Sequence, residues 1–153
     1  MLIFKTLHIL SMFTAVTAFL GGEFFFAFAI WRRDVRALAA SHRAAVQGRL
    51  GVVGTVAFFA GIGFGLLTAA TGGLDFFQGW LINAYVLVAL FLVNVALNVN
   101  KGLRLGEAAA EADAGRRPIE EVVRDMAASH MVRFFVVNVV IFAAFIADMV
   151  LKF

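Results

Sequence analysis

The chain has 153 residues, of which 63% are hydrophobic and only 15% are charged. Because soluble globular domains carry about 25% charged residues, this composition excludes an ordinary soluble fold and indicates an integral membrane protein. The formal net charge of +3 does not indicate a nucleic-acid partner, since the basic residues flank apolar segments, where they orient a protein in the membrane.

Four segments are apolar and long enough to cross about 30 Å of hydrocarbon. We expect them at residues 2–31, 50–71, 80–99 and 131–150. The first segment is too long for the apolar region of a signal peptide and ends at Arg32 and Arg33, as a spanning helix does. The sequence therefore predicts that residues 1–153 form one domain, an all-α, multi-pass antiparallel bundle of four membrane-spanning helices in the lipid bilayer.

Arginine and lysine gather in two of the three connections between these segments. Five of them lie between the first two spans and five between the last two, whereas the connection at residues 72–79 has none. By the positive-inside rule, the two basic connections are cytoplasmic and both chain termini are outside. In the last connection, Pro118 followed by Glu120 and Glu121 predicts the start of a cytoplasmic helix that continues without a break into the fourth span.

Glycines recur along one face of the second span. Gly54, Gly61 and Gly65 share this face, and the last two form a GxxxG pair. Small residues at this spacing let a neighbouring helix approach closely, so we expect these glycines to pack against another span. The alternative is a flat surface against a planar cofactor.

Three polar residues lie deep in the first, third and fourth spans. Measured from the basic ends of these spans, Glu23 lies roughly 13 Å in, Asn94 about 10 Å and Asn138 about 12 Å. We therefore expect a buried polar cluster near mid-membrane. An ionisable group at this depth is a functional candidate, and hydrocarbon favours the protonated form of Glu23, ready for proton transfer. The alternative is a structural hydrogen-bonding role, neutral or paired with Arg133.

A second polar cluster is predicted near the outer surface. Its members are Lys5, Asn83 and Asp148, from three different spans. An acid at this position requires a partner, and we expect Asp148 to pair with Lys5, Lys152 or His8.

His8 has three interpretations: a hydrogen-bonded structural residue, a haem or metal ligand, or a proton relay. Joint ligation of haem by His8 and His130 is not expected, because the two lie about 30 Å apart along the bundle. The chain has no cysteine, which excludes covalent c-type haem and thiolate metal sites. It also lacks phosphate-loop, zinc-protease and nucleophile-elbow motifs. The sequence therefore predicts no metal site and leaves open which residues, if any, are catalytic.

The chain also resembles known proteins. The resemblance is carried by Phe4-Lys5-Thr6-Leu7-His8-Ile9-Leu10, Phe19-Leu20-Gly21-Gly22, Gly61-Ile62-Gly63-Phe64-Gly65-Leu66-Leu67 and Trp80-Leu81. These segments resemble a DUF family of small bacterial four-span membrane proteins, which is similar in pattern to copper-resistance D-like proteins and HemJ-type protoporphyrinogen oxidases. In the HemJ-type enzymes a first-span histidine, matched here by His8, is implicated in haem binding. The resemblance thus implies the bacterial inner (cytoplasmic) membrane and haem b as a cofactor.

Two hypotheses of different classes follow, with a third behind them. The first is a redox-associated membrane protein that binds haem or a related tetrapyrrole through His8. The second is a non-catalytic accessory or assembly subunit, which packs against other membrane protein subunits or against copies of itself. The third is a proton pathway through Glu23.

Overall fold

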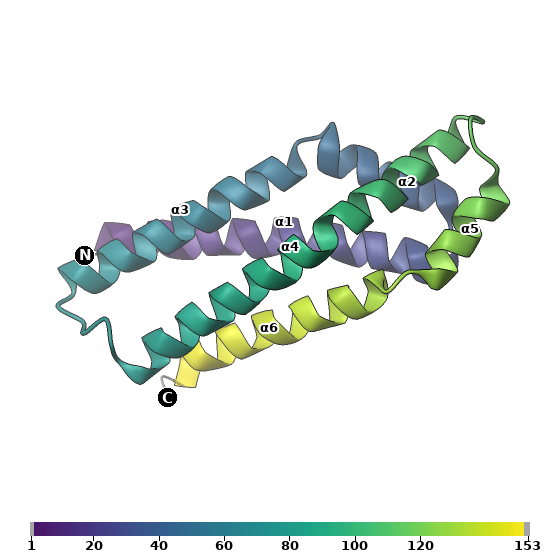
Figure 1. Ribbon diagram of the computed structural model, residues 1–153. Helices are drawn as coiled ribbons and strands as arrows, with labels where there is room; N and C mark the ends of the chain where they lie inside the picture. The colour runs from purple at the N-terminus through teal and green to yellow at the C-terminus, as the bar shows by residue number, and fades with distance from the viewer. Residues whose placement is uncertain (1, 152–153) are drawn as a thin grey trace.

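The computed structural model describes residues 2–151. Over this range the chain forms six α helices (Figure 1): α1 Leu2–Arg32, α2 Val35–Val46, α3 Leu50–Thr71, α4 Gly79–Asp113, α5 Ile119–Ala128 and α6 Met131–Leu151. The helices α1, α3, α4 and α6 are long and apolar enough to cross a membrane. The expected all-α membrane bundle is therefore confirmed.

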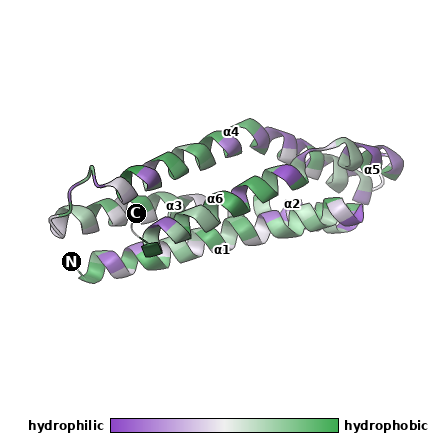
Figure 2. Ribbon diagram, turned by 90° about the horizontal axis from the view of Figure 1, so that it is seen from below, coloured by the Kyte–Doolittle hydropathy of each residue, from purple (hydrophilic) through white to green (hydrophobic). Residues whose placement is uncertain are grey.

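The two ends of the bundle differ in character. The described ends of the chain lie together at one end, which we call the terminal end, and α2 and α5 lie at the other (Figure 1). We call this second end, formed by residues 32–49 and 101–130, the basic end. Hydrophilic residues gather there, whereas the long helices are mostly hydrophobic between the two ends (Figure 2). The positive-inside rule predicts that the basic end is cytoplasmic.

The four long helices are arranged as two pairs. α3 packs along α1, α4 packs along α6, and α1 contacts α6 to join the pairs. Within the described residues the backbones of α3 and α4 do not meet, but their side chains do, because the rings of Phe58 and Phe91 lie with centroids 5.3 Å apart. Phe19 of α1 and Phe142 of α6 also pack on Phe91. These four phenylalanines, which we call the aromatic cluster, close the middle of the bundle.

The basic end is built around α2, which the sequence analysis treated only as a connection. Asp34 caps α2 by accepting a hydrogen bond from the Ala37 N–H at 2.9 Å, as N-cap residues do. Leu38 and Ala39 form the buried stripe of this amphipathic helix and pack with Ala109 of α4. This core resembles that of a soluble protein, and it fixes the position of α4 beyond the membrane.

α4 continues past the predicted third span, which ends at residue 99, as far as Asp113. Alanine is the strongest helix former, and residues 108–112 are alanine-rich. Leu105, Ala108 and Ala112 are buried in the core of the basic end. Gly106 permits the closest contact there, because a Cβ at this position would lie 2.5 Å from Nδ1 of His42 on α2.

The prediction of an unbroken helix from residue 118 into the fourth span was wrong. α5 ends at Ala128, and Ser129 has extended backbone angles of φ −74° and ψ 148°. The Ser129 hydroxyl donates a hydrogen bond to the Met126 carbonyl at 2.9 Å, and so satisfies one of the last acceptors of α5. The break lets Val122 and Met126 pack into the core of the basic end. A single straight helix through α5 and α6 would not place both side chains there.

Candidate functional site

The glycine face of α3 lies directly against α1. A Cβ on Gly54 would lie 3.1 Å from Cβ of Ala18, and a Cβ on Gly61 would lie 2.6 Å from Sδ of Met12. A Cβ on Gly65 would lie 2.9 Å from Nδ1 of His8. Side chains of α1 therefore cover these glycines, which leaves no bare glycine surface for a planar cofactor.

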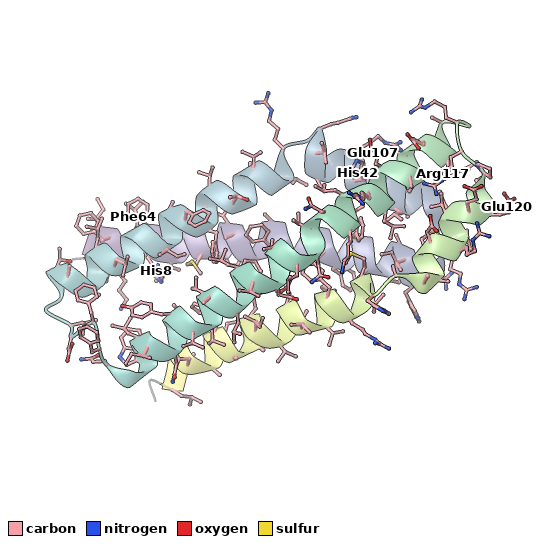
Figure 3. The ribbon with its side chains drawn as sticks, viewed as in Figure 1. His8, His42, Phe64, Glu107, Arg117 and Glu120 are labelled. Atoms are coloured by element: carbon pink, nitrogen blue, oxygen red, sulfur yellow. The ribbon has the colours of Figure 1, made fainter. Side chains whose placement is uncertain are left out.

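The packing of α1 on α3 also holds His8 in position. Its Nδ1 lies 2.7 Å from the carbonyl oxygen of Gly61. A carbonyl oxygen only accepts, so Nδ1 donates this hydrogen bond, and in the neutral imidazole Nε2 is then the nitrogen with the lone pair. Figure 3 places His8 toward the terminal end of the bundle, far from Arg117 and Glu120 at the basic end. Within residues 2–151, no three His, Cys, Asp or Glu side chains cluster in a way that could hold a metal ion.

A chain of hydrogen bonds links α1, α6 and α4 through side chains of which Asn138 is buried and Glu23, Asn94 and Asn98 are partly buried. The amide nitrogen of Asn138 lies 2.8 Å and 3.0 Å from the two carboxyl oxygens of Glu23. The amide nitrogen of Asn94 donates to Oδ1 of Asn138 at 2.8 Å. The side-chain amide of Asn98, one turn further along α4, donates to the main-chain carbonyl oxygen of Asn94 at 2.9 Å and to its Oδ1 at 3.2 Å. The structure thus brings Glu23, Asn94 and Asn138 together and adds Asn98; we call these four residues the carboxyl–amide chain.

The carboxyl–amide chain has a direction. Each amide donates toward the next member, and the last one, Asn138, is completely buried and donates to Glu23. Hydrogen bonds aligned in this way polarise one another and stabilise negative charge at the accepting end. Hydrocarbon opposes this charge, because an ionised group inside a membrane is costly. The protonation state of Glu23 is therefore subject to two opposing influences.

No cation neutralises Glu23 among the described residues. Arg133, considered above as a partner, is exposed and does not form an ion pair with it. The ion pairs that do form lie at the basic end, such as Arg43 with Asp113 at 3.0 Å. The charge state of Glu23 therefore depends on the amides and on access to water.

The two ends of the carboxyl–amide chain have different surroundings. Toward the terminal end, Phe19 lies one helical turn from Glu23 and belongs to the aromatic cluster. Toward the basic end, Asn98 lines a cavity of about 460 Å³ together with Lys101 and Arg104. The carboxyl–amide chain therefore lies between the aromatic cluster on one side and a cavity on the other.

The predicted outer cluster forms only in part. The amide of Asn83 donates to Oδ1 of Asp148 at 3.3 Å, and the two line a cavity of about 330 Å³. Asp148 is 6% exposed, and its Oδ2 has no hydrogen-bond partner within residues 2–151. Lys5 is exposed and makes no ion pair with Asp148 there, His8 bonds to Gly61 instead, and Lys152 lies outside the described residues. The pairings of Asp148 with Lys5 and with His8 were therefore wrong predictions, because α1 directs His8 toward α3.

Two features of this region were not predicted from the sequence. Asn98 completes the carboxyl–amide chain, and its position four residues after Asn94 on one helix was the available signal. The cavity beyond it depends on the break between α5 and α6, for which the sequence offers no proline or glycine.

A family model described as a predicted integral membrane protein (DUF2269) matches residues 2–153. No curated protein and no solved structure matches the chain.

Proposed function

The chain belongs to the DUF2269 family of predicted integral membrane proteins, and from this premise we propose that it is a membrane-embedded proton-binding protein. Glu23 takes up and releases the proton, and the basic end is the side from which the proton arrives. The observation that carries the proposal is the carboxyl–amide chain, which joins a mid-membrane carboxyl group to the cavity at the basic end.

The four residues have separate roles in this proposal. Glu23 is the group that changes protonation state, since its carboxyl oxygen forms and breaks the O–H bond. Asn138 donates to both carboxyl oxygens and so stabilises the carboxylate left when the proton departs. Asn94 and Asn98 orient Asn138. The proton itself travels through water from the cavity, because an amide side chain neither binds nor releases a proton near neutral pH.

A site open to one side does not carry a proton across the membrane by itself. The aromatic cluster separates Glu23 from the terminal end. We therefore place the protein as an accessory subunit, whose proton exchange is used by a larger membrane complex or by an oligomer of the chain. Stoichiometric co-purification with another membrane protein, or with copies of the chain, would support this placement, and purification of the chain as a lone monomer would contradict it.

Dicyclohexylcarbodiimide, an apolar reagent that reacts with protonated carboxyl groups, is expected to modify Glu23. The adduct forms fastest at low pH and more slowly as the pH rises, because only the protonated acid starts the reaction. Mass spectrometry of the protein in lipid nanodiscs measures the adduct and its position.

Two variants show which carboxyl group the reagent modifies. Glu23→Gln removes the adduct, whereas Asp148→Asn removes the other membrane carboxyl group and leaves labelling at Glu23 unchanged. Absence of a Glu23 adduct in the wild type, or a rate that does not depend on pH, would refute the proposal.

A second candidate, binding of haem, is favoured by one observation. Because the Gly61 carbonyl holds the Nδ1 proton of His8, Nε2 is in the form that coordinates a haem iron. His8 would be the residue that holds the haem, and Met12 lies one turn along the same helix. When bound, haem would supply one-electron redox chemistry, and His8 would hold it in place.

The absorption spectrum tests this second candidate. If His8 binds haem, the protein purified from haem-supplied cells has a Soret band that shifts on reduction with dithionite, and His8→Ala loses it. A wild-type spectrum without a Soret band excludes the haem candidate and does not affect the proton-binding proposal.

A further inference from the structure

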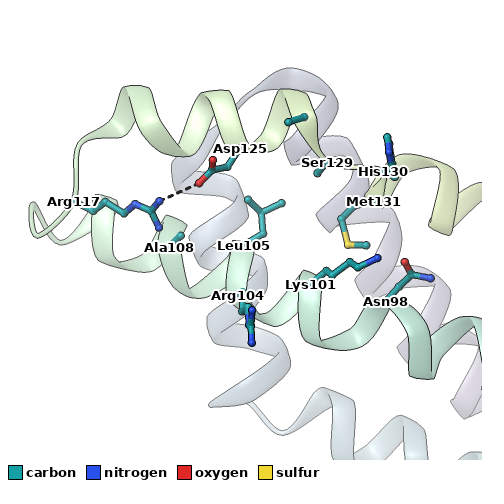
Figure 4. Close-up of a pocket in the computed structure, with 11 residues that line it drawn as sticks. Asn98, Lys101, Arg104, Leu105, Ala108, Arg117, Asp125, Ser129, His130 and Met131 are labelled. Carbon is teal, nitrogen blue, oxygen red and sulfur yellow. Dashed lines mark hydrogen bonds and ion pairs between the residues drawn. The ribbon is translucent and has the colours of Figure 1, made fainter.

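The cavity at the basic end lies between α4 and the junction of α5 with α6 (Figure 4). Lys101 and Arg104 line it from α4, and His130 and Met131 line it where α6 begins. Lys101 extends along α4 toward Met131, so that its amine lies inside the region between the two helices (Figure 4). The cavity is thus walled by basic side chains from two different elements.

The basic groups in the cavity are not equally neutralised. Arg117 pairs with Asp125 at 3.0 Å and with Glu121 at 3.3 Å. Lys101 and Arg104 have no acidic partner among the described residues. The cavity therefore carries an excess of positive charge, with His130 beside it.

The start of α6 adds to this charge. An α helix presents free N–H groups and a partial positive charge at its first turn. The first turn of α6 contains no acidic residue, and the Ser129 hydroxyl just before it donates to the Met126 carbonyl. An anion in the cavity would lie beside His130 and Met131 at this helix start and would also pair with Lys101 and Arg104.

We infer that this cavity binds a phosphate group, either that of an anionic phospholipid headgroup or the free anion. A point charge from lysine, the forked donors of arginine and a helix N-terminus together match the several oxygens of a phosphate. The depth fits a headgroup, since Lys101 and His130 lie where the apolar parts of α4 and α6 end. Basic pockets between spanning helices at the cytoplasmic surface recognise such headgroups. This inference does not depend on Glu23.

The test measures the thermal unfolding midpoint of the full chain in mild detergent against ligand concentration. The probes are dioleoyl phosphatidylglycerol, dioleoyl phosphatidylcholine and inorganic phosphate. We expect phosphatidylglycerol to raise the midpoint of the wild type and phosphatidylcholine to have no comparable effect. The double variant Lys101→Gln/Arg104→Gln is expected to need at least about tenfold more phosphatidylglycerol for the same shift, a difference of about 1.4 kcal/mol.

A matched variant separates the cavity from general surface charge. Arg32→Gln/Arg36→Gln removes the same charge from exposed positions at the basic end outside the cavity and should respond like the wild type. Lys101→Arg/Arg104→Lys keeps the charge and should restore binding, which also shows that the glutamine variant fails by charge rather than by misfolding.

The responses to the three probes show which form of phosphate the cavity binds. Stabilisation by phosphatidylglycerol alone identifies a lipid headgroup, and equal stabilisation by inorganic phosphate identifies the free anion. An unchanged response in Lys101→Gln/Arg104→Gln, an equal loss in Arg32→Gln/Arg36→Gln, or no response of the wild type to any probe overturns the inference.

Discussion

Replacement of Gly61 by leucine is expected to separate α1 from α3 and to destabilise the protein by about 3 kcal/mol or more, at the upper end of the usual cost of overpacking. Even a Cβ at this position would lie 2.6 Å from Sδ and 3.4 Å from the backbone nitrogen of Met12. The side chain of Met12 can move, but its backbone cannot without shifting α1. The displacement also removes the hydrogen bond of His8 to the Gly61 carbonyl. Thermal unfolding in detergent, followed by circular dichroism, measures the loss.

Gly63→Leu is the matched control on the same helix. A Cβ on Gly63 meets no atom within 4 Å, and the residue is exposed toward lipid. Leucine there should be neutral or slightly stabilising, because it is a better helix former than glycine. Similar losses of stability in the two variants would show that α1 and α3 do not pack through this glycine face.

Replacement of Asn138 by leucine is expected to cost about 1–3 kcal/mol, the penalty for leaving buried polar partners without hydrogen bonds. Asn138 is completely buried and bonds to both Glu23 and Asn94. Its loss removes the donors that stabilise the Glu23 carboxylate, so labelling of Glu23 by the carbodiimide should persist to higher pH. Unfolding and the pH dependence of labelling are measured on the same preparation.

A double-mutant cycle isolates the interaction of the two residues. In Glu23→Leu/Asn138→Leu no carboxyl group is left unpaired, so the combined loss of stability should be smaller than the sum of the single losses by about 0.5–2 kcal/mol. Asn100→Leu, an exposed position on α4 outside the carboxyl–amide chain, is the control and should have little effect. Additive losses would show that Glu23 and Asn138 are not coupled.

The depth of the polar residues was predictable from the sequence, whereas their partners were not. A helix rises by a fixed 1.5 Å per residue, so counting from the basic ends placed Glu23, Asn94 and Asn138 at one level. Rotation and lateral position depend on packing. His8 was expected near Asp148, but the glycine face of α3 brings it to Gly61.

The basic end was the least predictable part, because it folds like a soluble domain. Hydropathy identifies spans by the absence of charge, and α2 is short, arginine-rich and outside any apolar segment. Its buried stripe of Val35, Leu38 and Ala39 follows helical spacing, but its stability comes from packing on α4 and α1. The break at Ser129 also depends on tertiary packing, because burial of Val122 and Met126 determines the direction of α5.

Infrared difference spectroscopy of Glu23 tests the central claim most directly. The protein is placed in sealed vesicles with the basic end outward, and the pH is changed only outside while the interior is buffered. We expect a protonated-carboxyl band that disappears as the outside pH rises, shifts in heavy water and is absent in Glu23→Gln. A spectrum without any carboxyl band that depends on Glu23, or a band that follows the pH inside the vesicles, would contradict proton binding from the basic end.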